Sequence, residues 1–186
     1  MIKPTLEQTN LVTKLLYESI NTLIVNDSDI FNIDIIMPQQ ISEDARILNR
    51  ELHETAINHR LAYYLEQNMQ DGPLSEYSVD IEYNRFYGNA KLVKTVEGLI
   101  AIRPDIVIHT RMNRNINPQH FLAIEAKKGE ILLHDINKIK GLISDSHYNY
   151  LFGFTISYCS NNNYTIGSIY YFDGREIISQ PLNNSK

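Results

Sequence analysis

The chain has 186 residues, of which 43% are hydrophobic, so it is long enough to bury one core. Its formal charge of -5 argues against a protein that coats nucleic acid by bulk electrostatics, because such binding depends on many Lys and Arg residues meeting phosphates. A single cysteine excludes an internal disulfide, and no apolar run approaches the ~20 residues of a membrane span, so we expect a cytoplasmic protein without a membrane partner.

The N-terminal part of the chain is predicted to be mainly helical. Apolar residues recur at helical spacing over 5–24, which predicts an amphipathic helix. Residues 26–40 mix turn formers with an apolar cluster and indicate a loop or a short strand. The longest helical pattern covers 42–69, with Ser42 as its candidate N-cap.

Strand patterns dominate after this helix. Alternation of apolar and polar residues predicts a strand over 76–85, and the following 14 residues, FYGNAKLVKTVEGL, indicate a loop or a hairpin. Apolar runs at 102–111 and 121–129, joined by a turn-like segment, predict two neighbouring antiparallel strands. The remaining predicted elements are a helix over 131–144 and strands over 150–159 and 168–174.

The predicted strand over 121–129 carries two opposite charges on one face. Side chains alternate along a strand, so Glu125 and Lys127 share a face with Ala123, whereas Leu122 and Ile124 take the other face. On a half-buried surface such charges are unfavourable unless they have partners, a metal ion or a catalytic task.

Pro104-Asp105 opens the preceding strand, so Asp105 can converge with Glu125 and Lys127 if the two strands are neighbours. Two nearby carboxylates repel each other unless a hard divalent cation lies between them, and Mg²⁺ prefers such oxygen ligands. The lysine can then orient or deprotonate a water bound to the metal and offset the charge of a phosphate. The pattern therefore indicates a hydrolytic centre for phosphodiesters.

A Pro-Asp pair followed by Glu-x-Lys on adjacent strands resembles the PD-(D/E)XK superfamily of restriction-endonuclease-like nucleases. The strings ELHETAINHRLAYYLE, VDIEYNR and IRPDIVIH are also similar to uncharacterised bacterial members. The resemblance implies an α/β fold, with a restriction-endonuclease-like core whose mixed central β-sheet is flanked by helices in α-β-β-β-α-β order. It implies a single nuclease-like domain over 1–186, in which 1–41 form an N-terminal helical extension and 42–174 form the catalytic core.

The resemblance also implies the roles of the charged residues. Asp105 and Glu125 would be metal ligands, the backbone carbonyl of Ala126 would be a third ligand, and Lys127 would be the catalytic lysine. The expected activity is that of a Mg²⁺-dependent nuclease, with Mn²⁺ able to substitute, that cleaves phosphodiester bonds in DNA. The expected nucleic-acid-binding residues are Arg85, Arg103, Arg111 and Lys138, and a homodimer partner or a companion subunit is expected to assist recruitment.

An acid on the preceding helix completes the family pattern. Glu54 is the first candidate for this catalytic acid, because its spacing from Ile57 and Leu61 turns it toward the sheet, and Glu51 is the second. The alternative interpretation is an ordinary helix glutamate that pairs with a neighbour such as Asn58.

The other features have structural interpretations as well. Asp105 can cap a turn, and Glu125 and Lys127 can form an ion pair on a solvent-exposed face of their strand. Asp135 and Lys138 have the i,i+3 spacing of a solvated helix pair. The rival functions are a catalytically silent nuclease-fold module that binds a protein or nucleic acid, and a nuclease that acts on RNA.

Overall fold

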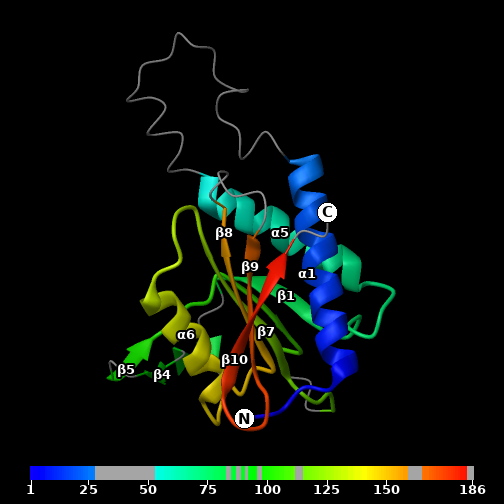
Figure 1. Cartoon of the computed structure of the whole chain (residues 1–186). Helices are drawn as coiled ribbons and strands as arrows, with labels where there is room; N and C mark the ends of the chain where they lie inside the picture. The colour runs from blue at the N-terminus through cyan, green and yellow to red at the C-terminus, as the bar shows by residue number, and fades with distance from the viewer. Residues whose placement is uncertain are drawn as a thin grey trace, which may run out of the picture.

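The computed structural model describes residues 1–27, 53–82, 85–86, 89–90, 92–95, 98–111, 115–158 and 165–183. Within these ranges the protein is an α/β fold with a six-stranded mixed sheet, two short two-stranded pairs and three helices (Figure 1). The predicted α/β class, with helices flanking a mixed sheet, is therefore confirmed. The predicted loop at 26–40 lies almost wholly outside the described residues, as do Ser42 and Glu51.

The helices of the described ranges are α1 (Leu6–Asn26), α5 (His53–Met69) and α6 (Leu133–Ser144). Helix α1 begins at a capping box in which Thr5 Oγ1 accepts the Gln8 N–H and Gln8 Oε1 accepts the Thr5 N–H. All three helices were predicted, although residues 42–52 of the second one lie outside the described residues. No helix in these ranges is long and apolar enough to span a membrane.

The central sheet has the strand order β1-β6-β7-β8-β9-β10. Strands β7 and β8 are parallel, and every other neighbouring pair is antiparallel, including the predicted pair β6 and β7. Helix α6 supplies the crossover that joins the two parallel strands. The strands are β1 (Ser78–Ile81), β6 (Ile106–His109), β7 (His120–Lys127), β8 (Phe152–Ser157), β9 (Thr165–Phe172) and β10 (Ile177–Asn183).

The last strand, β10, was not predicted, because its polar composition and Pro181 disfavour a strand. It is an edge strand that pairs only with β9, and an edge is where a proline is tolerated. The ambiguous segment before β6 forms two short pairs, β2 (Arg85–Phe86) with β3 (Asn89–Ala90) and β4 (Leu92–Thr95) with β5 (Gly98–Ala101). The hairpin alternative is thus confirmed for this segment.

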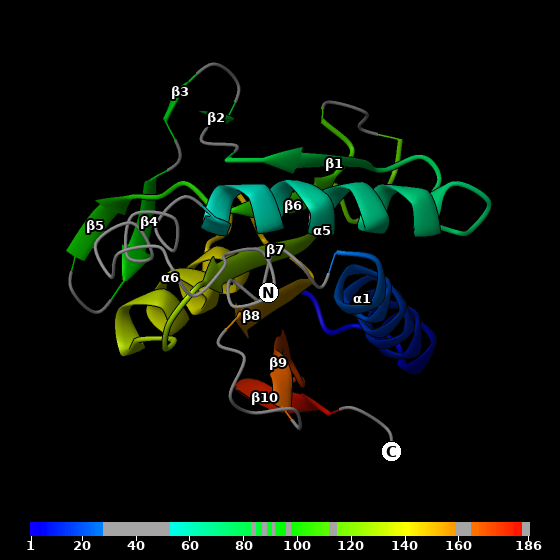
Figure 2. The same ribbon diagram turned by 90° about the horizontal axis from the view of Figure 1, so that it is seen from above.

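The sheet separates two hydrophobic clusters. Helices α1 and α5 cover one face, where Ile106, Leu122 and Ile124 share one buried cluster with residues of both helices. Helix α6 covers the other face, where Val107 and Ala123 are buried. Figures 1 and 2 show α1 and α6 on opposite sides of the sheet. Val107 and Ala123 therefore face α6, and Glu125, two residues further along β7, lies on the same face.

Helix α1 shares the larger cluster with the sheet, so residues 6–26 pack into the same core as the strands. At its C-terminus, the Asp27 carboxylate accepts hydrogen bonds from Arg60 Nε at 3.0 Å and from the Tyr64 hydroxyl at 2.6 Å. These contacts join the end of α1 to the middle of α5.

Candidate active site

The pairing of β6 with β7 brings the two central acids together. Ile106, the first residue of β6, lies opposite Ile124. Asp105 directly precedes it, and its N–H donates to the Ile124 carbonyl at 3.1 Å, next to Glu125. The Ala126 N–H donates to the Asp105 carboxylate, and the charge of Asp105 acts on its neighbour Glu125, so the two carboxylates share one neighbourhood. The predicted convergence of these side chains follows from a register that the sequence pattern alone did not supply.

Backbone N–H groups at the end of β7 hold two of the acids. The Ala126 N–H donates to Asp105 Oδ2 at 2.8 Å, and the Lys128 N–H donates to Glu54 Oε2 at 2.8 Å. Glu54 belongs to the first turn of α5, so it reaches the end of β7 from the helix layer on the opposite face. The structure therefore brings Glu54, Asp105 and Glu125 to one end of β7.

Two lysines and two acids form a closed ring of ion pairs beside Asp105. Lys138 Nζ lies 2.6 Å from Glu125 Oε1 and 3.5 Å from Asp135 Oδ1. Lys127 Nζ lies 3.8 Å from the same Glu125 oxygen and 4.0 Å from the same Asp135 oxygen. Each acid thus stands between two ammonium groups, and we call these four residues the ion ring.

The prediction that Asp135 and Lys138 form a solvated pair on α6 is wrong for Asp135, which is buried. Only 3% of this residue is exposed, and its Oδ2 accepts the Leu132 N–H at 3.1 Å, which caps the start of α6. Because α6 packs on the sheet face that carries Glu125, positions 135 and 138 turn inward rather than toward water. The i,i+3 spacing was visible in the sequence, but the direction of this helix face was not.

Burial and like charge act on both central acids. Burial raises the pKa of Asp105, and the charge of Glu54 adds to this, against the Ala126 N–H and the charge of Lys127. Burial also raises the pKa of Glu125, with a contribution from the Asp105 charge, against the Lys138 hydrogen bond. Burial opposes protonation of Lys138, but its hydrogen bond to Glu125 and the charges of both acids in the ion ring raise its pKa overall.

The charges of this cluster suit a divalent cation. The cluster gathers four acids, Glu54, Asp105, Glu125 and Asp135, and the contacts described for it include two ammonium groups, those of Lys127 and Lys138. Asp105 Oδ1 and Glu125 Oε2 accept no hydrogen bond from the described residues, and carboxylate oxygens are the ligands that Mg²⁺ prefers.

The donor set therefore fits a hard divalent ion in charge and in chemistry. The described ranges nevertheless contain no group of three or more His, Cys, Asp or Glu side chains already arranged around a common metal position. One Glu125 oxygen faces the Lys138 ammonium group instead.

Two buried residues beneath the acids were not singled out as site residues from the sequence. The Tyr158 hydroxyl donates to Asn58 Oδ1 at 2.8 Å, and Asn58 lies one turn after Glu54 on α5. Burial raises the pKa of Tyr158 well above its usual range, and the charges of Asp105 and Glu54 raise it further. This contact joins residues 100 positions apart, so no local sequence pattern could predict it.

Arg103 and Arg111, the predicted nucleic-acid-binding arginines whose side chains the structure describes, pair with acids outside the cluster. Arg111 follows the far end of β6 from Asp105 and donates two hydrogen bonds to Asp80, which also binds the buried His109. Arg103 lies 3.6 Å from Glu82, close to the start of β6. The side chain of Arg85 lies outside the described residues. Among the predicted basic residues with described side chains, Lys138 is the one that reaches the clustered acids.

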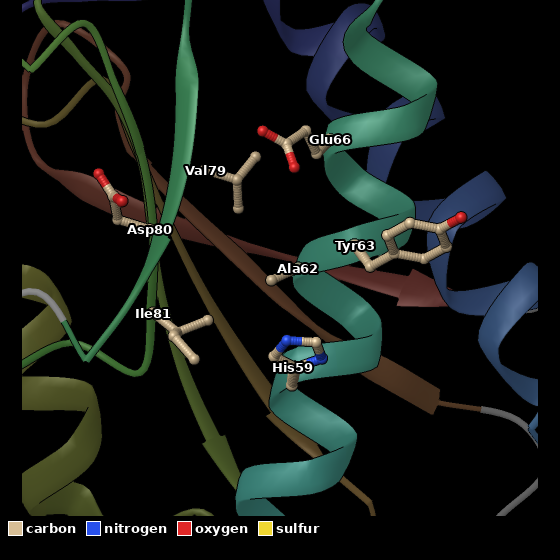
Figure 3. Close-up of a pocket in the computed structure, with 7 residues that line it drawn as sticks. All are labelled: His59, Ala62, Tyr63, Glu66, Val79, Asp80 and Ile81. Carbon is tan, nitrogen blue, oxygen red and sulfur yellow. The ribbon is translucent and has the colours of Figure 1, made fainter.

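A separate groove lies between α5 and the edge strand β1 (Figure 3). Val79 and Ile81 point toward the helix, whereas Asp80 points to the other side of the strand. The groove is lined by His59, Ala62, Tyr63, Glu66, Val79, Asp80 and Ile81, and the clustered acids and lysines are not among its lining residues.

A scan against protein-family models and a search of curated proteins found no match to this chain. The resemblance to the PD-(D/E)XK nucleases therefore depends on the residues themselves and on their arrangement.

Proposed function

We propose that this chain is a Mg²⁺-dependent nuclease with a restriction-endonuclease-like, PD-(D/E)XK core that hydrolyses phosphodiester bonds in DNA. One observation carries the proposal: the Ala126 N–H holds the Asp105 carboxylate beside Glu125, and Lys127 Nζ lies 3.8 Å from Glu125. Glu54 at the same end of β7 supports it, because the family pattern calls for an acid from the preceding helix.

The residues divide the chemistry between them. Asp105, Glu125 and the backbone carbonyl of Ala126 would hold the ion, and Mg²⁺ supplies Lewis-acid stabilisation of the charge that develops on a phosphate. The Lys127 side chain is 30% exposed, so its ammonium group can meet both the acids and an incoming substrate. It would orient the attacking water and offset charge on the phosphate.

A second candidate function follows from the ion ring. Glu125 is already paired with Lys127 and Lys138, so these charges satisfy one another without a metal ion. In this alternative the cluster is a structural ion network, and the chain is a silent nuclease-fold module that binds a protein or nucleic acid.

Plasmid cleavage distinguishes the two candidates. We expect supercoiled DNA to be cut with Mg²⁺ or Mn²⁺ but not with EDTA, and Asp105→Ala and Lys127→Ala each to reduce the rate about 100-fold or more, because each removes a group that acts on the charged phosphate. The exposed Asp71→Ala and Lys14→Ala variants are the matched controls and should cut at the native rate.

Absence of cutting, together with absence of divalent binding in calorimetry, would favour the silent module. The same preparation tested on RNA decides between the two nucleic acids as substrate.

A further inference from the structure

The shortest ion-pair contact of the candidate site joins Glu125 to a lysine outside the family pattern. Lys138 Nζ lies 2.6 Å from Glu125 Oε1, whereas the motif lysine, Lys127, lies 3.8 Å from that oxygen. Lys138 belongs to α6, so it reaches the carboxylate from the helix layer and not from the strand. Glu125 is the carboxylate that the proposed function needs as a metal ligand.

Burial makes this contact strong. The Glu125 side chain is 4% exposed and the Lys138 side chain 21% exposed, so water screens their attraction less than it would on an open surface. A divalent cation that binds Glu125 must either displace this ammonium group or share the buried carboxylate with it, because both are cations that bind the same group.

Asp135 keeps the lysine in the site after such a displacement. Its Oδ1 lies 3.5 Å from Lys138 Nζ, and its Oδ2 is held by the Leu132 N–H at 3.1 Å. An ammonium group that leaves Glu125 therefore still has a fixed anionic partner on the same helix.

We propose that Lys138 is a tethered cation that competes with the divalent ion for Glu125 and thereby weakens metal binding. The inference rests on the proposed function, because it takes Glu125 as a metal ligand. It makes Lys138 a positioning residue of the site: it holds the Glu125 carboxylate in place until the metal binds.

Mn²⁺ binding to the full chain, measured by titration calorimetry at fixed pH and ionic strength, tests this competition. We expect Lys138→Met to bind Mn²⁺ about tenfold more tightly than the native chain, because the variant loses both a competing partner and a nearby positive charge. Lys140→Met removes an exposed lysine from the same helix and should keep the native affinity.

Two further variants separate competition from a loss of structure. Lys138→Gln removes the charge but keeps a hydrogen-bond donor, so it should also bind Mn²⁺ more tightly than the native chain. It serves as the test if Lys138→Met fails to fold. Lys138→Arg keeps the charge and should stay near the native affinity. A residue with a merely structural role would give weaker or unchanged metal binding in every variant.

The outcomes also separate this inference from the proposed function. If the native chain binds Mn²⁺ and cuts DNA, but neither neutral variant at position 138 binds the ion more tightly, only the competition is overturned. If neither the native chain nor the variants bind Mn²⁺, the proposed function fails together with it.

Discussion

Asp105 shows how one buried carboxylate can lower the stability of the folded chain. Burial and the charge of Glu54 raise its pKa, so the folded chain binds a proton at this carboxyl more readily than the unfolded chain does. By linkage, the ionised carboxylate lowers the free energy of unfolding at neutral pH, and this penalty disappears as the pH falls through the raised pKa.

Asp105→Asn should therefore stabilise the metal-free chain. The substitution removes the charge, while the amide oxygen can still accept the Ala126 N–H. In thermal melts with EDTA at pH 7.5, we expect a midpoint a few degrees higher than the native value, and this gain should shrink as the pH is lowered toward the raised pKa. The exposed Asp71→Asn variant is the control, and a lower midpoint for Asp105→Asn would contradict the argument.

At the scale of elements, the contact between α6 and β8 positions the ion ring. Gly153 on β8 lies directly under the helix, where an added Cβ would collide with Ile139 Cγ2 and lie 3.2 Å from Ile143 Cδ1. The absence of a side chain at this position lets α6 approach the sheet closely enough for Lys138 to reach Glu125.

Gly153→Ala should lift α6 from the sheet. We expect a loss of about 1–3 kcal/mol in the free energy of unfolding, as for other overpacked cores, measured by denaturant titration. Gly72→Ala is the matched control, because its added Cβ would meet only the Met69 carbonyl at an ordinary 3.8 Å. Equal free energies of unfolding for the two variants would contradict this, because they would show that α6 can move away from the added methyl group without loss of stability.

The sequence predicted most elements because their signals are local. Helical spacing and strand alternation depend on neighbours within a few residues, and α1, α6, β7 and β8 follow those patterns. Strand β10 was not predicted, because several of its residues have low strand propensity. It forms through its pairing with β9, which depends on the tertiary structure.

At the scale of the whole molecule, α1 and the sheet share one core. Leu16 of α1 is fully buried in the same cluster as Leu122 and Phe154 of the sheet. The N-terminal helix therefore contributes to the stability of the strands that carry the acids.

Leu16→Ala should destabilise the entire chain rather than α1 alone. We expect a loss of about 2–5 kcal/mol in the free energy of unfolding, because the substitution leaves a cavity in the shared core. Helical circular dichroism and tyrosine fluorescence should report one coincident transition. Val25→Ala, at a position that is 76% exposed on the same helix, should change stability little; separate transitions would show that α1 unfolds independently.

The sequence by itself determined that Glu125 and Lys127 share a strand face and that Asp105 precedes a neighbouring strand, because alternation and strand order are properties of the local chain. Only the tertiary structure decided that Asp105 lies beside Glu125, that Glu54 binds the Lys128 N–H, and that Arg111 lies at the far end of β6. It also turned Asp135 and Lys138 inward. The physical reason is that register and helix placement depend on packing of the whole core, which no short stretch of sequence contains.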